Sequence, residues 1–459
     1  KGHFQRPIPI DTLRIDSHAT SLLYLEKSRA MMQHRYAHAL ALAALTVLLQ
    51  PAHALVSIGD GAPQERSSRV VVPLRREVTP VLHEGKLVSY KTAYSGLLHV
   101  GFPRAVEMRV VFDTGSGHLV LPAANCFDKA CWTKQKYSPL LSNMSLEEDM
   151  NTVTIGYGKG KVRGSLVKDL VCIGPKPADG VVNQDNCVRN GIVAAWEMSD
   201  DPFLSFPFDG ILGLGLGSLA VTDDFSFTHQ LATAGKWYSG QFAVLLSRGD
   251  AEGDSEISFG GYDPDHLLEP LTWVPLVKPA MGYWMVDLLN VYVGDTRLDI
   301  CSDEGPCVAI LDTGTSHLAV PAQHLDTFKG ILKRPAAGLS DCRLAPAPNL
   351  TVEMRGWNLT MPPETYMREL PIDPSQLNMQ ADEGEELACT ARLMSVAVPQ
   401  VGPNMFILGE PALQRYYTVY DAKRLQVGLG LAKQREPKRP DARDVKKEVV
   451  RDEVFLLQH

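Results

Sequence analysis

The sequence lacks a hydrophobic run long enough to cross a membrane. Its longest apolar stretch, Ala39–Leu49, is shorter than the ~20 residues that a transmembrane helix requires. A basic residue precedes this stretch and small residues follow it at Ala52 and Ala54, an order typical of a signal peptide over residues 31–54. A buried helix is the alternative interpretation. We expect residues 1–30 to be an upstream extension that takes no part in the fold.

The sequence also lacks an excess of basic residues. It carries 45 Lys and Arg against 53 Asp and Glu, a net charge of −8, so a nucleic-acid partner has no electrostatic support. No cysteine pair has zinc-finger spacing with histidines at the required distance, which disfavours a zinc site. We expect no metal, no cofactor and no nucleic-acid partner. Residues 433–459 are charged and poor in apolar side chains, which predicts a flexible tail.

The eight cysteines all follow the predicted signal peptide, and their even number is typical of disulfides formed in an oxidising compartment. Three N-x-S/T sequons, at Asn143, Asn349 and Asn358, are usable for glycosylation only in the secretory route. We therefore expect a protein of the secretory pathway, either secreted or held in an acidic compartment of the lysosome or vacuole type.

Long helical periodicity is scarce. From about Tyr90 onward the chain consists of short β-branched or aromatic runs separated by glycines, such as Leu97–Phe102 and Leu166–Ile173. Runs of this length and composition predict a mostly β protein.

An internal repeat indicates the architecture. Val110–Pro122 matches Ala309–Pro321, and Asp, Thr, Gly, His, Leu and Pro recur in place at an offset of 199 residues. Each copy is followed about 100 residues later by an apolar-apolar-Gly element, Ile211–Gly213 and Ile407–Gly409. The repeat predicts two related β lobes, each of which presents one Asp on a turn after a strand.

The repeated Asp-Thr-Gly motifs place one carboxyl group in each lobe, at Asp113 and Asp312. Hydrolysis of a peptide without a metal or a covalent nucleophile needs one group that deprotonates water and another that protonates the carbonyl oxygen. Two carboxyl groups that share a site do both, because like charges close together push their pKa values apart and the pair holds one proton. The alternative is that each Asp merely caps a strand-ending turn.

At these motifs the sequence resembles the pepsin-like aspartic proteases, from about Tyr90 to Ala432. The resemblance implies a mostly β, bilobal fold with a central substrate cleft between lobes at residues 90–270 and 271–432. It implies an endopeptidase that works at acid pH on extended peptides, that pepstatin-type inhibitors block, and that is a monomer. The supporting stretches are Phe208–Leu214, Phe259–Asp263, Leu271–Leu276 and Tyr416–Asp421.

The resemblance also implies roles for individual residues. Asp113 and Asp312 would bind the attacking water, while Thr114 and Thr313 would lock the two loops together. A β-hairpin flap would cover the cleft with Tyr157, for which an exposed hairpin aromatic is the alternative. Substrate-binding positions are expected at Gly115, Ser116, Tyr157, Gly158, Gly314 and Thr315, with Ser116 and Thr315 as hydrogen-bond donors to the carboxylates.

The chain departs from the family pattern at Val120 and Glu410, and it has a pair of matching histidines. Val120 stands where the family has a tryptophan that hydrogen-bonds the flap tyrosine, and Glu410 replaces a commoner Asp. His118 and His317 occupy matching positions, and we interpret both as structural residues that face away from the carboxylates.

By resemblance, the cysteines would pair within lobes as Cys126–Cys131, Cys301–Cys307 and Cys342–Cys389, which leaves Cys172 with Cys187. Residues 55–89 resemble the start of a pro-segment, whose Arg69, Arg75 and Arg76 would cover an acidic cleft. Two other functions stay open: a catalytically inactive pepsin-like binding or inhibitor protein, and a secreted β-rich adhesion or lectin-like domain.

Overall fold

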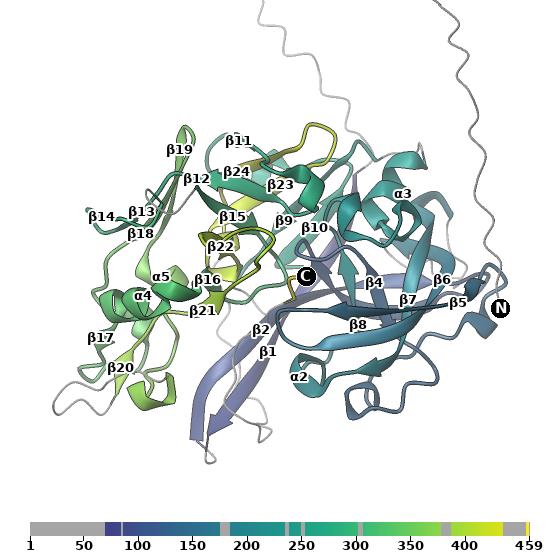
Figure 1. Ribbon diagram of the computed structural model, residues 1–459, viewed down its shortest axis with the longest axis horizontal. Coiled ribbons are helices and arrows are strands. Elements are labelled where there is room, and N and C mark those ends of the chain that lie inside the picture. Colours follow the sequence, from purple (N-terminus) through teal and green to yellow (C-terminus); the bar gives the residue numbers. More distant parts are fainter. Residues whose placement is uncertain are drawn as a thin grey trace, which may run out of the picture. The chain divides into compact units, whose positions relative to one another are not determined.

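The two copies of the repeated motif fold into the same arrangement of four strands (Figure 1). In the first copy, β3 (Val106–Asp113) runs parallel to β8 (Gly210–Gly213), β8 runs antiparallel to β4 (Leu119–Pro122), and β4 runs parallel to β7 (Cys187–Met198). The second copy repeats these pairings in the same order. Its strands are β15 (Cys307–Leu311), β22 (Met405–Leu408), β16 (Leu318–Pro321) and β21 (Leu393–Val396).

This computed structural model describes residues 69–83, 86–174, 184–234, 238–248, 253–301, 306–377, 387–434 and 456–458. All of them belong to one compact unit that spans residues 65–459. The predicted upstream extension and signal peptide, residues 1–54, lie outside the described residues. Within the described residues, no helix is long and apolar enough to cross a membrane.

Thirteen of the described strands form one sheet, in the order β11-β24-β23-β9-β10-β1-β2-β3-β8-β4-β7-β6-β5. The strands not yet given are β1 (Val70–His83), β2 (Lys86–Val100), β5 (Leu146–Gly156), β6 (Lys161–Ile173), β9 (Gln241–Leu245), β10 (Ser255–Phe259), β11 (Thr272–Pro275), β23 (Tyr416–Asp421) and β24 (Gln426–Leu431). Because β23, β24 and β11 come from the second half of the chain, this sheet joins both halves.

The second half forms three smaller sheets among the described residues. β12 (Met285–Leu288) joins the second copy of the motif in the order β12-β15-β22-β16-β21, β14-β13-β18-β19 form a four-stranded sheet, and β17 pairs with β20. These last strands are β13 (Asn290–Val293), β14 (Thr296–Leu298), β17 (Arg334–Pro335), β18 (Leu350–Met354), β19 (Trp357–Met361) and β20 (Ala388–Cys389). The helices are short: α2 (Asp200–Phe203), α3 (Phe227–Thr233), α4 (Leu325–Leu332), α5 (Pro363–Tyr366) and α6 (Glu410–Leu413).

The motif strands are buried because their sequences are continuous apolar runs. Every residue of β4, β8, β15, β16 and β22 is buried, as expected of strands covered on both faces. The mostly β, bilobal fold expected from the sequence is confirmed. It places the end of β3 and the end of β15, where the two Asp-Thr-Gly motifs begin, inside the protein.

The predicted pro-segment contributes a strand to the main sheet. β1 pairs antiparallel with β10 on one side and with β2 on the other, and its Val72 and Leu74 are buried (Figure 1). The expectation that its arginines cover the catalytic cleft is wrong. Arg69 pairs with Asp263, Arg75 with Glu77 and Arg76 with Glu410. Removal of the segment in a mature protein stays a prediction.

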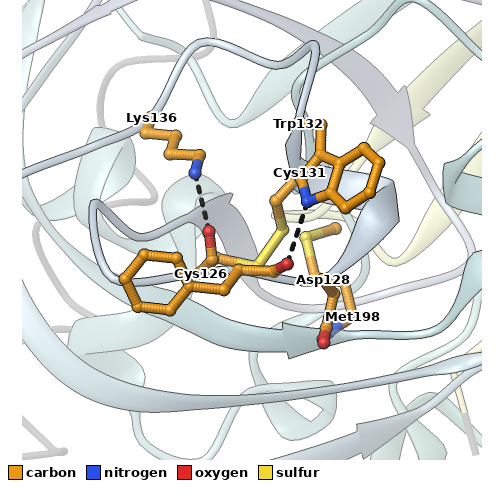
Figure 2. The surroundings of a disulfide bond; sticks show 7 residues. Cys126, Asp128, Cys131, Trp132, Lys136 and Met198 are labelled. Atoms are coloured by element: carbon orange, nitrogen blue, oxygen red, sulfur yellow. Dashed lines mark hydrogen bonds between the residues drawn. A yellow bond between two sulfur atoms is a disulfide. The ribbon is translucent and has the colours of Figure 1, made fainter.

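The four expected disulfides are confirmed. Cys172 and Cys187 face each other across the antiparallel strands β6 and β7. Figure 2 shows the surroundings of Cys126–Cys131, in the loop that follows β4. There Lys136 Nζ donates to the Cys126 carbonyl at 2.6 Å, and Met198 N–H donates to the Asp128 carboxylate at 2.8 Å, which ties the loop to the end of β7.

The sequons lie where an attached glycan would have room. Asn143, Asn349 and Asn358 are all exposed. Their modification stays a prediction.

Candidate active site

The two Asp-Thr-Gly loops hold each other by a reciprocal set of hydrogen bonds. Thr114 N–H donates to Thr313 Oγ1 at 3.0 Å, and Thr313 N–H donates to Thr114 Oγ1 at 3.0 Å. Each threonine hydroxyl then donates across the interface, Thr114 to the Leu311 carbonyl at 2.8 Å and Thr313 to the Phe112 carbonyl at 2.6 Å. The expected lock between the loops is therefore present in the geometry, and it brings Asp113 and Asp312 together.

Each carboxylate receives the same two donors from its own loop. Ser116 Oγ donates to Asp113 at 2.5 Å, and Thr315 Oγ1 donates to Asp312 at 2.5 Å. The second donor is the N–H of the motif glycine, 2.9 Å from Asp113 Oδ1 in the first loop and 2.8 Å from Asp312 Oδ1 in the second. These bonds fix the orientation of both carboxyl groups, so their inner faces meet.

The glycines of the motif are required by the close approach of the two loops. A Cβ on Gly115 would lie 2.7 Å from the Asp312 carboxyl carbon, and a Cβ on Gly314 would lie 2.2 Å from Asp113 Oδ1. The apolar-apolar-Gly elements have the same cause. A Cβ on Gly213 would lie 2.4 Å from the backbone nitrogen of His118, and a Cβ on Gly409 would lie 2.3 Å from the carbonyl oxygen of His317. Only glycine lets these backbones pack against the loops.

Burial raises the pKa of both carboxyl groups. Asp113 and Asp312 are both fully buried, and burial is the largest cause that raises the pKa of each above its ordinary value of 3.8. The nearby charge of Asp312 raises the pKa of Asp113 further, well above that value. A hydrogen bond between the two carboxyls raises the pKa of Asp113 and lowers that of Asp312, so the two groups titrate as a pair and not independently.

The flap hairpin closes over this pair. β5 and β6 pair up to Gly156 and Lys161, and Tyr157 N–H donates to the Gly160 carbonyl at 2.9 Å across the turn. The Tyr157 side chain is only 3% exposed and packs with Phe203 at a ring distance of 6.0 Å, so the exposed-aromatic alternative is wrong. Its hydroxyl has no hydrogen-bond partner among the described residues, which agrees with the replacement of the usual tryptophan by Val120.

The two symmetric histidines have different surroundings. His118 Nε2 accepts from Val221 N–H at 2.9 Å, so the ring proton lies on Nδ1. Nδ1 is 3.1 Å from the Gln458 side-chain oxygen, and burial lowers the pKa of His118 below its ordinary value. His317 Nδ1 instead lies 2.9 Å from Ser316 Oγ. The interpretation of His118 as purely structural missed its contact with Gln458.

Glu410 anchors the second loop from behind. Its N–H donates to the Thr315 carbonyl at 2.8 Å, and its buried carboxylate receives hydrogen bonds from Thr92, Gln414 and Arg392. Burial raises its pKa, but the charges of Arg392 and Arg76 and these hydrogen bonds outweigh burial and hold the pKa below its ordinary value. The lowered pKa favours the ionised form of Glu410, which holds the loop between β15 and β16 through the Thr315 carbonyl.

Sequence reasoning missed one part of the site. Leu456–Gln458, expected to belong to a flexible tail, lie in the site itself, and Leu456 and Leu457 are fully buried. Their signal in the sequence is the pair of leucines at the end of a charged stretch, which offers apolar surface that a solvated tail does not need. No group of three or more metal-ligating side chains gathers anywhere in the described part of the chain.

The comparison with known proteins gives the family of this site. The family model for eukaryotic aspartyl proteases matches residues 93–432. The chain belongs to that family. This aspartyl protease is 32% identical to cathepsin E of Rattus norvegicus over 344 residues, which is 74% of this chain and 80% of the relative. It is 30% identical to pepsin-2B of Gadus morhua over 347 residues, covering 74% and 96% of the two chains. It is an aspartic-type endopeptidase that acts on peptide bonds.

The buried aspartates predict how the stability of this protease depends on pH. Because the pKa of Asp113 is raised above 3.8, its contribution to stability is fully present below that value and is lost as the pH rises through the raised pKa. Asn at this position does not titrate. We expect Asp113→Asn to raise the melting temperature relative to the unmodified protein more at pH 7 than at pH 4, measured by differential scanning calorimetry. An equal shift at both pH values would contradict the raised pKa.

The unpartnered hydroxyl of Tyr157 predicts an asymmetry between two substitutions. Tyr157→Phe removes a buried polar group without a partner, so we expect no loss of stability and a gain of up to ~1–3 kcal/mol in the free energy of unfolding. Tyr157→Ala empties the space beside Phe203 and should cost ~3–5 kcal/mol. Denaturant unfolding checks both. A Phe variant that is less stable by more than ~1 kcal/mol would mean that the hydroxyl has a partner.

Proposed function

We propose that Asp113 and Asp312 form the catalytic pair and hydrolyse peptide bonds of proteins at acid pH by activating a water molecule. The observation that carries the proposal is the symmetric placement of two buried carboxyl groups. Each is held by a glycine N–H and a hydroxyl from its own loop, and burial raises the pKa of each. One carboxyl of such a pair is a base and the other an acid at the same pH.

The pair divides the two roles. Its ionised carboxylate takes a proton from the water as the water oxygen attacks the carbonyl carbon of the peptide bond. Its protonated carboxyl gives a proton to the carbonyl oxygen, which forms a neutral tetrahedral diol. When the diol collapses, the first carboxyl gives the proton that it took from the water to the leaving nitrogen, the second takes a proton back from a diol hydroxyl, and the carbon–nitrogen bond breaks. The pair then has its starting protonation.

The substrate would lie as an extended strand between the flap and the two loops. Gly115 and Gly158 offer backbone groups on opposite sides, and Tyr157 covers the bound peptide. Ser116, Gly314 and Thr315 shape the floor around the carboxylates. An acid working range suits a compartment of lysosome type or an acidic secretion, and we expect a monomer that pepstatin-type inhibitors block.

Hydrolysis of a denatured protein such as casein at pH 4, with and without pepstatin, tests the function. Asp113→Asn and Asp312→Asn should each lower kcat/KM by roughly 100- to 10,000-fold, because each removes the acid–base exchange. The double variant should be hardly worse than either single one, since the pair acts as a unit. Asp326→Asn, whose carboxylate is 96% exposed, is the matched control and should keep full activity.

The inactive-binding-protein alternative gives a different result in the same assay. It predicts no pepstatin-sensitive hydrolysis in any variant. An Asp312→Asn protein that keeps more than a few per cent of the activity would remove Asp312 from the proposed pair.

A further inference from the structure

Leu456–Gln458 lie in the site as an added strand. Gln458 N–H donates to the Gly115 carbonyl at 3.0 Å, and the flap residue Gly158 donates its N–H to the Leu457 carbonyl at 3.0 Å. Tyr157 and Gln458 form an antiparallel bridge. The segment thus makes main-chain bonds to the first Asp-Thr-Gly loop on one side and to the flap on the other, which is how an extended peptide adds to a sheet edge.

The two leucines point into opposite halves of the site, as successive side chains of a strand do. Leu456 belongs to the apolar cluster of the flap, with Tyr157 and Val120, whereas Leu457 belongs to the cluster of the second half, with Tyr283 and Ile310. A Cβ on Gly314 would lie only 3.1 Å from the Leu456 Cβ. With Leu456 against the second loop and Gln458 bonded to the first, the backbone between them crosses from one catalytic loop to the other.

The Gln458 side chain is hydrogen-bonded in a polar pocket. Its oxygen faces two donors, Gly117 N–H at 3.1 Å and His118 Nδ1 at 3.1 Å, and its NH₂ group donates to the Leu219 carbonyl at 2.9 Å. The Gln458 carbonyl accepts from the Tyr283 hydroxyl at 2.5 Å. A glutamate would set a carboxylate oxygen against the Leu219 carbonyl, and an apolar side chain would leave all three groups without their bonds.

We propose that Leu456–Gln458 are an intramolecular, substrate-like ligand of this cleft, which excludes peptides while seated, and that the Gln458 pocket selects an amide side chain in the peptides that replace it. The inference rests on the proposed function of the cleft and names part of its substrate class. Because the segment is tethered, its effective concentration is on the order of millimolar, so even modest intrinsic affinity keeps it seated. The peptide that enters must make the same bonds to Gly115 and Gly158, so the two exclude each other.

Activity of the full chain tests the exclusion. Leu456→Asp/Leu457→Asp puts two carboxyl groups, polar whether ionised or not, against two apolar clusters, so kcat/KM for a short peptide substrate at pH 4 should rise at least tenfold. Leu140→Asp, which changes a 90% exposed leucine, is the matched control and should leave kcat/KM unchanged. Mass spectrometry confirms that each chain is intact when assayed. An unchanged kcat/KM in the double-Asp variant, with its melting temperature within a few degrees of the parent, would overturn the exclusion.

Binding tests the pocket without requiring activity. A synthetic peptide with the sequence of residues 453–458 is titrated calorimetrically at pH 6 into the full chain carrying Asp113→Asn, Leu456→Asp and Leu457→Asp. We expect saturable binding that pepstatin displaces, and at least tenfold weaker binding of peptides with Gln458→Glu or Gln458→Met. At pH 6 the glutamate of the first of these is ionised. Equal affinity of all three peptides, or no binding of the parent peptide, would overturn the proposal.

The two measurements separate this inference from the proposed function. Peptide binding with amide selection, together with no hydrolysis by the chains that keep Asp113 and Asp312, would support the ligand and contradict the catalysis. Pepstatin-sensitive hydrolysis that the double-Asp variant leaves unchanged, together with no peptide binding, would support the catalysis and contradict the ligand.

Discussion

Two carboxyl groups that are fully buried and face each other are the constraint on which the rest of this structure depends. Removing a charge from water is costly, and two neighbouring carboxyl groups cannot both ionise easily. The fold must therefore supply hydrogen-bond donors that stabilise the ionised form. It does so twice over, with a glycine N–H and a hydroxyl for each Asp. The threonine lock then fixes the distance between the loops, because neither Thr114 nor Thr313 can move without breaking bonds to the other half.

The surrounding framework serves the same constraint. Parallel pairing of β3 with β8 and of β15 with β22 brings Gly213 and Gly409 under the two loops, where no side chain fits. Behind the second loop, Glu410 joins that framework to Arg76 of β1, so the first strand of the main sheet supports the catalytic half farthest from it in sequence. In front, the flap and the first loop leave main-chain groups that Leu456–Gln458 use. A segment of this chain makes the main-chain bonds that the proposed peptide substrate would make.

Much of the fold and of the candidate site was predictable because the repeated motif predicts the same local structure twice. Two Asp-Thr-Gly motifs behind apolar runs required two buried strands and two facing carboxyls, and the resemblance supplied the flap and the disulfides. Three features were not predictable from pattern alone. Arg69 and Arg76 pair with Asp263 and Glu410, which are far away in sequence, so only the packing of the folded chain shows which carboxylates they meet. Tyr157 is buried because Phe203 comes to it from another element. Leu456–Gln458 were predicted to belong to a flexible tail because the composition of this segment does not show which distant residues it contacts.

The pH dependence of kcat/KM tests the shared proton most directly, because it reports the ionisation of the free enzyme's acid and base. The account predicts a bell with its maximum in the acid range. Below the window both carboxyls are protonated and no base remains, and above it the pair has lost the proton that the acid donates. The measurement is best made with a short uncharged peptide, so that substrate ionisation does not contribute. A profile with a single limb that rises to a plateau at neutral pH would contradict a catalytic pair that works with one proton.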